Sequence, residues 1–229
     1  MSESSTVRRS ILINVDPVEL PGDLVVAPKA FGIVVFAHGS GSSRRSPRNI
    51  EVARRLNEAG SGTLLFDLLT PAEAEERANV FDIELLAERL VVAEKWLRTW
   101  PGLGNLPIGF FGASTGAAAA LVAAARLRND IAAVVSRGGR PDLAGAALEH
   151  VTAPTLLIVG GEDVEVLGMN REAAGRLASE TRLQVIAGAT HLFEERGALE
   201  EVSRLAAGWF AKHLIEAGHD RRLIADRPA

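Results

Sequence analysis

Short apolar runs alternate with longer segments of helical periodicity along most of this sequence, and this alternation limits the folds open to it. Six runs rich in branched and aromatic residues lie at 33–36, 64–66, 108–111, 133–135, 156–159 and 183–186. Each run is too short for a helix and is typical of a buried strand. Strands that alternate with helices indicate an α/β fold, in which a mostly parallel central sheet has helices on both faces.

Apolar residues between and after these runs recur about every 3.6 positions, which predicts helices that cover the sheet. One set comprises Ile83, Leu86, Leu90, Leu97 and Trp100, and a later set comprises Val202, Leu205, Trp209, Phe210 and His213. The chain contains no linker or repeat, so we expect residues 1–217 to form a single domain. The charged segment 218–229 is expected to be a loose C-terminal tail.

The segment 10–27, ahead of the first core run, reads as two strands joined at Pro21-Gly22-Asp23. Proline followed by glycine is a strong turn signal. Consecutive strands joined by a tight turn are antiparallel, so this segment predicts an antiparallel hairpin at one edge of the sheet.

Composition excludes several classes of function. With 229 residues, of which 47% are hydrophobic, the chain can bury one sizeable core. Its net charge of -4 argues against binding of nucleic acid, which normally requires a basic excess. No apolar run approaches the roughly 20 residues that cross a bilayer, so we expect no membrane partner and a cytoplasmic protein. The lack of cysteine excludes disulfides, thiolate nucleophiles and cysteine-ligated metals.

The pentapeptide Gly112-Ala113-Ser114-Thr115-Gly116 follows the run 108–111 and leads into a tract of alanines. A match to Gly-x-Ser-x-Gly is a weak signal by itself, and the plain interpretation is a serine in a glycine-rich turn. Its position between a strand and a helix is that of a nucleophile elbow, where the glycines permit a cramped turn that lifts the serine above the sheet. Ser114 is therefore a candidate nucleophile.

A serine hydroxyl needs a base to take its proton and an acid to orient that base. Asp163 stands just after the run 156–159, and His191 just after the run 183–186. Because the carboxyl ends of parallel strands share one edge of a sheet, Ser114, Asp163 and His191 are expected to converge there. The chain order of serine, acid and histidine is also the one expected for a nucleophile elbow.

Other residues compete for these roles. Glu162 and Asp142 are the rival acids, one beside Asp163 and the other after a different strand. Among the histidines, His213 falls in the apolar stripe of the last helix, and His150 and His219 lie near helix ends, where side chains are usually solvated. Only His191 has a position suited to a base.

His38 begins the segment His38-Gly39-Ser40-Gly41, which follows the run 33–36. The loop at this point in an elbow-containing sheet supplies a backbone N–H to the substrate oxygen, and its small residues permit a close approach. We assign the oxyanion donors to the backbone N–H groups of Ser40 and Thr115, and place His38 at the substrate.

The same loop has a competing interpretation as a dinucleotide-binding turn, with Asp67 at the end of the next strand. That fingerprint fails, because Arg44 stands where its third glycine belongs, and the chain contains no P-loop motif. We therefore expect no nucleotide, and no metal or other cofactor.

The segments HGSGSS, GASTG, SRGGRPDLAG, VGGED and GATHLFEE together resemble the dienelactone hydrolase-related branch of the α/β-hydrolase family, particularly its stand-alone or phosphoribosyltransferase-linked members. The resemblance covers nearly the whole chain. It implies an α/β-hydrolase fold with Ser114 as nucleophile, His191 as base and Asp163 as orienting acid. Dienelactone hydrolases proper carry cysteine at the nucleophile, and the serine here favours a general carboxylic ester as substrate.

The resemblance implies hydrolysis of a small ester, or of a lactone or anionic ester, through an acyl-enzyme. The alternative is a non-catalytic module of the same fold that docks to a partner such as a phosphoribosyltransferase; a homodimer is a further option. Only the connections 68–82 and 137–153 are long enough to overhang the site, so we expect no large lid. Arg44 and Arg137, with Arg45 and Arg48, are candidates to bind an anionic substrate group. Arginines after strands are also often only solvated.

Overall fold

All six apolar runs are strands of one sheet in the computed structural model, which describes residues 6–225. The strands are β3 (Ile33–Ala37), β4 (Gly62–Phe66), β5 (Ile108–Ala113), β6 (Ile131–Arg137), β7 (Thr155–Gly160) and β8 (Thr181–Ile186). Every residue of β3, β4, β5 and β7 is buried. Burial on both faces explains why these strands read as continuous apolar runs rather than as alternating ones.

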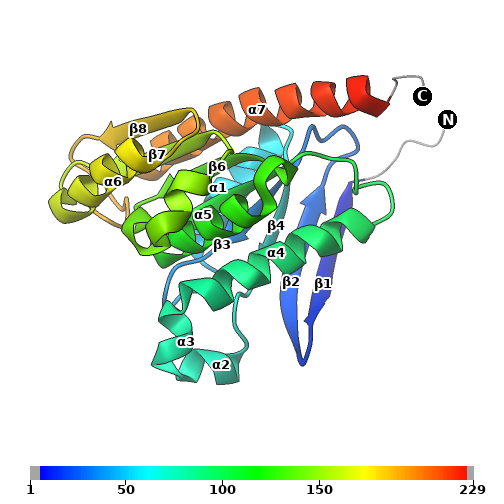
Figure 1. The fold of residues 1–229 in the computed structure, drawn as a ribbon, viewed down its shortest axis with the longest axis horizontal. Helices are drawn as coiled ribbons and strands as arrows, with labels where there is room; N and C mark the ends of the chain where they lie inside the picture. Colours follow the sequence, from blue (N-terminus) through cyan, green and yellow to red (C-terminus); the bar gives the residue numbers. More distant parts are fainter. Residues whose placement is uncertain (1–5, 226–229) are drawn as a thin grey trace.

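The sheet of the described residues has eight strands in the order β1-β2-β4-β3-β5-β6-β7-β8 (Figure 1). The six strands from β4 to β8 pair in parallel, whereas β1 (Val7–Val15) and β2 (Val18–Val26) form an antiparallel pair at the edge beside β4. This confirms the predicted mostly parallel sheet with an antiparallel edge.

The predicted position of the hairpin turn is wrong. The chain turns at Asp16 and Pro17, and Pro21-Gly22-Asp23 lies inside β2, with Pro21 opposite Leu12 of β1. Leu20, Gly22 and Leu24 are every second residue of β2 and face the core, and the two leucines are fully buried. Continuous burial of every second residue through β2 therefore outweighed the local turn signal of Pro-Gly.

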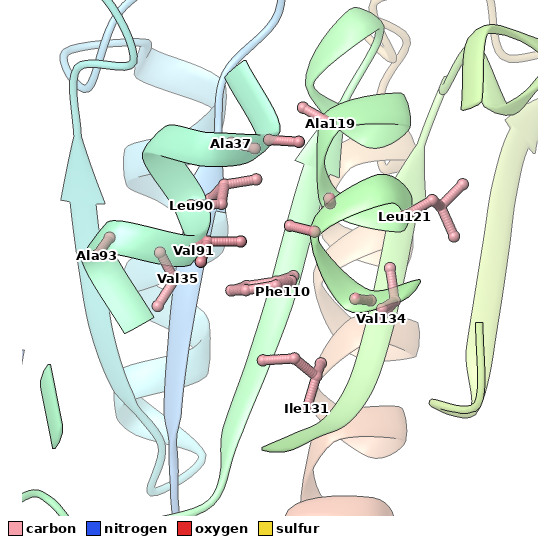
Figure 2. Close-up of a cluster of buried hydrophobic side chains, with 14 of the residues drawn as sticks. Val35, Ala37, Leu90, Val91, Ala93, Phe110, Ala119, Leu121, Ile131 and Val134 are labelled. Carbon is pink, nitrogen blue, oxygen red and sulfur yellow. The ribbon is translucent and has the colours of Figure 1, made fainter. Parts of the chain in front are cut away.

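Helices cover the two faces of the sheet (Figure 1). α4 (Ile83–Thr99), α5 (Thr115–Leu127) and α6 (Val164–Arg176) pack over one face, and α1 (Pro47–Glu58) and α7 (Ala198–Ala225) over the other. Figure 2 shows part of the first core, where Leu90 and Val91 of α4 meet Val35 and Phe110 of the sheet. The alanine tract of α5 is buried throughout, because its small side chains let the helix lie close to the strands.

Short helices occupy the two connections that the sequence marks as able to overhang the sheet. α2 (Pro71–Glu75) and α3 (Arg77–Phe81) lie in the first, and the 3₁₀ segment η2 (Pro141–His150) lies in the second. A further 3₁₀ turn, η1 (Arg128–Asp130), joins α5 to β6. None of the helices within the described residues combines the length and apolar character needed to cross a membrane.

The expectation of a loose tail from residue 218 is wrong for residues 218–225, because α7 continues to Ala225. Residues 226–229 lie outside the described part of the chain. No proline interrupts residues 198–225, so the backbone can remain helical through this segment.

Candidate active site

Ser114 stands between β5 and α5 in a conformation that serine rarely adopts, with φ 52° and ψ -123°. Its N–H donates to the carbonyl of Arg137 (3.3 Å), and its own carbonyl accepts from the N–H groups of Ala117 and Arg140 (3.1 Å each). The residue is half-buried. A strained backbone of this kind persists only where surrounding contacts hold it, and such sites are often functional.

Gly112 and Gly116, which flank the turn at Ser114, lie so close to neighbouring backbone atoms that neither position has room for a side chain. A Cβ on Gly112 would collide with the backbone of Ala117 in the first turn of α5. A Cβ on Gly116 would collide with the carbonyl oxygens of Ala37 and His38, at the end of β3. Only glycine at both positions lets the chain reverse this tightly between a strand and a helix.

His191 and Asp163 are in direct contact, as the sequence predicts. Nδ1 of His191 lies 2.7 Å from Oδ2 of Asp163, and the side chains are 39% and 15% exposed. With Nδ1–H donated to the carboxylate, Nε2 is left as the ring nitrogen that can accept a proton. The contact fixes the orientation of the imidazole.

The ring of His191 also lies beside the turn that supports Ser114. A Cβ on Gly138 would lie 3.6 Å from Cε1 of His191 and 3.1 Å from its carbonyl oxygen. Gly138 directly follows Arg137, whose carbonyl holds the Ser114 N–H. No hydrogen bond joins Ser114 to His191 in this structure, and such contacts often tighten only when substrate binds.

The competing residues lie elsewhere. Asp142 is paired with Arg140 at 2.7 Å, and Glu162 is exposed. His150 and His219 are exposed, and His213 is buried against Trp209, where burial lowers its pKa. Of the acids that the sequence offers, Asp163 alone contacts His191.

Thr115 and Ser40 meet, but not as predicted. The Ser40 N–H donates to Oγ1 of Thr115 (2.9 Å), so in this structure it is not free for a substrate oxygen. The Thr115 N–H opens α5, where an N–H has no acceptor within its own helix. A Cβ on Gly39 would lie 3.7 Å from Oγ of Ser114, which places this loop directly against the elbow.

His38 braces the loop and has no ring nitrogen free for a substrate, contrary to its predicted role. Its Nε2 accepts the N–H of Leu68 (3.0 Å), and Nδ1 lies 3.0 Å from the carbonyl of Gly39. One neutral tautomer satisfies both contacts. Burial lowers the pKa of His38, and the Gly39 contact and the Asp67 carboxylate oppose this only in part.

Arg44 is likewise committed to protein partners rather than to a substrate. Its backbone N–H donates to Oδ1 of Asp67 (2.7 Å), and its guanidinium pairs with Asp67 and, at 3.3 Å, with Asp23. These contacts occupy the carboxylate that a dinucleotide-binding turn would use. Within the described residues, no group of three or more His, Asp or Glu side chains could hold a metal ion.

Arg137 is buried beneath the site, with 7% of its surface exposed. Its guanidinium donates to Oδ1 of Asn49 in α1 (3.2 Å), while its Nε is enclosed without a partner. Burial, and then the charge of nearby Arg48, lower the pKa of Arg137 to about 10. Arg137 therefore remains charged at neutral pH. It is buried, whereas the alternative interpretation expected an arginine that is only solvated.

A cavity of about 350 Å³ opens beside the Ser40 loop. Residues 38–43 form one wall, and residues 67–71, Ala74, Val80 and Leu86 form the remainder. The volume is at the small end of the range for small-molecule sites. The connection 68–82, which the sequence marks as long enough to overhang the sheet, thus borders this cavity.

Sequence reasoning missed two contacts that organise this region, Ser40 with Thr115 and Asn49 with Arg137. Both join residues more than 70 positions apart. No motif or spacing in the chain signals either contact, because each depends on how separate loops meet at the edge of the sheet.

Comparison with curated proteins finds two relatives in Mycobacterium tuberculosis, from strains CDC 1551 and H37Rv, each named "Putative phosphoribosyl transferase". Each is 60% identical over 202 residues, which is 88% of this chain. The chain spans only 46% of the length of these relatives, so their name describes a longer protein. No family model matches the sequence.

Among solved structures, a dienelactone hydrolase from Anabaena variabilis is 53% identical, with a TM-score of 0.88. The match covers 92% of this chain and all of that one. Est1E from Butyrivibrio proteoclasticus (TM-score 0.76, 89% of this chain and 98% of that chain) is only 16% identical, which indicates a shared fold alone. Of these relatives, the ones that are at least 50% identical are therefore one solved structure named a dienelactone hydrolase and two longer proteins named phosphoribosyl transferases.

Proposed function

The chain belongs to the α/β-hydrolase family, in its dienelactone hydrolase-related branch, and on this premise we propose that it is a serine hydrolase that cleaves small carboxylic esters. The contact of 2.7 Å between His191 and Asp163 carries the proposal, because it prepares a base at the edge of the sheet where Ser114 is raised.

The reaction follows from the roles of three side chains. His191 Nε2 takes the proton of Ser114 as Oγ attacks the ester carbonyl, and Asp163 stabilises the imidazolium that forms. The tetrahedral intermediate collapses, and His191 returns the proton to the departing alcohol. Water then attacks the acyl-enzyme by the same route, which releases the acid and restores the Ser114 hydroxyl.

The oxyanion of the tetrahedral intermediate needs donors beside Ser114. The Thr115 N–H is one, because it stands at the positive end of α5. For the other we assign the Thr115 hydroxyl: its oxygen accepts the Ser40 N–H, and its own hydrogen is then free to point at the substrate. This replaces the sequence-based assignment of the Ser40 N–H.

Thr115→Val is expected to lower kcat by about 10²-fold, because removal of one oxyanion donor typically costs that much or more. Thr115→Ser retains the hydroxyl and is expected to stay within a few-fold of the wild type. Steady-state kinetics on p-nitrophenyl butyrate measures both. A Val variant as active as the wild type would mean that the freed Ser40 N–H is itself the donor.

The cavity beside the Ser40 loop supports a small substrate. Leu68, Leu69, Val80 and Leu86 give it mostly apolar walls, suited to an acyl or alcohol group of a few carbons. Because this cavity borders the same loop that abuts Ser114, we assign it to the apolar part of the ester.

Labelling tests the proposal directly. An aryl alkylphosphonate is expected to modify the protein once, at Ser114, because phosphonylation requires a hydroxyl activated by a neighbouring base. Peptide mass spectrometry locates the adduct, and exposed Ser42 in the adjoining loop serves as the internal control. An unmodified protein that also leaves a panel of esters, lactones and thioesters intact would favour a non-catalytic module that docks to a partner such as a phosphoribosyltransferase.

A further inference from the structure

A hollow of about 590 Å³ lies over β1 and β2, at one edge of the sheet (Figure 1). Arg8, Val25 and Thr63 are paired across β1, β2 and β4, and Asp23 is likewise paired with Leu65. Residues directly opposite each other in antiparallel strands place their side chains on the same face. Leu65 packs in the core against α1, so the hollow lies on the α1 face of the sheet.

The floor and one wall of this hollow are apolar. Val25 and Leu65 come from the sheet, and Ile50 and Ala53 come from α1. Ile50 is 48% exposed, so solvent reaches part of the apolar wall. The volume is within the range of small-molecule sites, which are mostly apolar with a few charged groups that fix the ligand. The hollow can therefore cover the apolar body of a small molecule.

The rim of the hollow carries more positive than negative charge. The charged side chains that line it are Arg8, Arg44, Arg45, Arg54, Asp23 and Glu58. Both carboxylates are already paired, Asp23 with Arg44 at 3.3 Å and Glu58 with Arg54. Arg8 and Arg45 form no ion pair within the described residues, so two guanidinium groups at this rim remain available to an external anion.

The hollow is separate from the substrate cavity beside the Ser40 loop. No residue that lines one of them lines the other. Arg44 borders the hollow and pairs with Asp67, which borders the substrate cavity. This ion pair is part of the partition between the two spaces, so a molecule in the hollow does not occupy the substrate cavity.

We propose that this hollow binds one small molecule with an apolar body and a single anionic head group, such as an aromatic or medium-chain carboxylate. The apolar walls remove the body from water, and the guanidinium groups of Arg8 and Arg45 match the geometry of a carboxylate. An inorganic anion would leave the apolar walls in water, and a neutral molecule would leave both arginines without a partner. The site goes beyond the proposed hydrolysis and does not depend on it.

Two fluorescent dyes test this proposal. Anilinonaphthalene sulfonate and N-phenylnaphthylamine share one apolar body and differ only by the sulfonate. Saturable binding of the sulfonate dye at one site is expected, about tenfold or more tighter than binding of the neutral dye, because hydrogen bonds to a charged group are added. Binding of the neutral dye that is equal or tighter would overturn the proposal.

The position of the dye is measured by NMR of ¹⁵N-labelled protein. Saturable shifts of the backbone amides are expected at Arg8, Val25, Arg45 and Ala53, which line the hollow. Shifts confined to residues 38–43 would place the dye in the substrate cavity and overturn the proposal.

Single arginine variants separate a specific contact from general electrostatics. Arg8→Gln and Arg45→Gln should each weaken binding of the sulfonate dye several-fold and leave the neutral dye unchanged. Arg9→Gln is the matched control, because Arg9 is opposite Leu24 and therefore lies on the other face of the sheet. Equal weakening by Arg9→Gln and Arg8→Gln would reduce the effect to net charge and overturn the site.

A filled hollow should exclude both dyes. Val25→Trp places a large side chain on the floor of the hollow and is expected to abolish binding, with thermal unfolding as the check that the variant is folded. Ile215→Trp is its control, because Ile215 lines a different hollow beside α7 and should change nothing. Loss of dye binding in the Ile215 variant alone would overturn the proposal.

An anionic lipid in a bilayer presents the same chemistry as a free amphiphile. Vesicles of phosphatidylglycerol are therefore sedimented with the protein, and no co-sedimentation is expected. Co-sedimentation that Arg8→Gln lowers, without binding of the free sulfonate dye, would assign the hollow to a lipid surface and overturn the proposal. None of these measurements involves turnover, so a failure of the serine-hydrolase proposal would leave this site standing.

Discussion

Replacement of Ser114 by alanine is expected to reduce ester hydrolysis by roughly 10⁴-fold or more, because the residue supplies the oxygen that forms the acyl-enzyme. The fold should survive the change, because the hydrogen bonds of Ser114 in this structure are made by its backbone and not by Oγ. Steady-state kinetics on p-nitrophenyl esters measures the loss, and thermal unfolding monitored by circular dichroism checks that the variant is folded.

Ser10→Ala is the matched control for this change. Ser10 lies in β1, at the edge of the sheet, and is exposed, so its variant should retain wild-type activity and should still be labelled by a phosphonate at Ser114. If Ser114→Ala is folded and turns over esters at a rate comparable to the wild type, Ser114 is not the nucleophile and the serine-hydrolase proposal fails.

Asp163→Asn is expected to lower kcat by about 10⁴-fold while the three-dimensional structure is retained. The amide can still contact Nδ1 of His191, but it favours the wrong tautomer and no longer stabilises the imidazolium. Ser114 then attacks without an effective base. The measurement is kcat on the ester that the wild type hydrolyses best, with burst-phase amplitudes reporting whether acylation has become the slow step.

The two rival acids provide isosteric controls for that experiment. Glu162→Gln alters an exposed side chain, and Asp142→Asn alters the ion pair with Arg140, so each should keep kcat within a few-fold of the wild type. If either of these variants loses activity while Asp163→Asn keeps it, the orienting acid has been misassigned and the contact at His191 is only structural.

The parallel part of the fold could be predicted from the sequence, because a strand buried on both faces appears as a continuous apolar run. β3 and β7 appear as unbroken apolar runs, since neither face of these strands tolerates a polar side chain. The hairpin turn could not be placed correctly. Pro21-Gly22 is a local turn signal, and its position inside β2 is decided by pairing with β1 and β4, which no short segment reveals.

The residues of the candidate site were likewise predictable only in part. Ser114, Asp163 and His191 were identifiable because each follows a strand, and the topology of a parallel sheet brings such positions to one edge. His38, Arg44 and Ser40 also follow strands or lie just beyond one, and yet the structure commits them to Leu68, Asp67 and Thr115.

What the sequence determined by itself, therefore, is the order of strands and helices and the set of polar residues delivered to the edge of the sheet. Hydrophobic periodicity and chain connectivity are local properties, so both can be read from the sequence alone. Only the tertiary structure decided which polar atoms remain free there, because hydrogen bonds are short and directional and depend on how distant loops meet. Nε2 of His191 is left to accept a proton while Nδ1 contacts Asp163, and this atom carries the proposed chemistry.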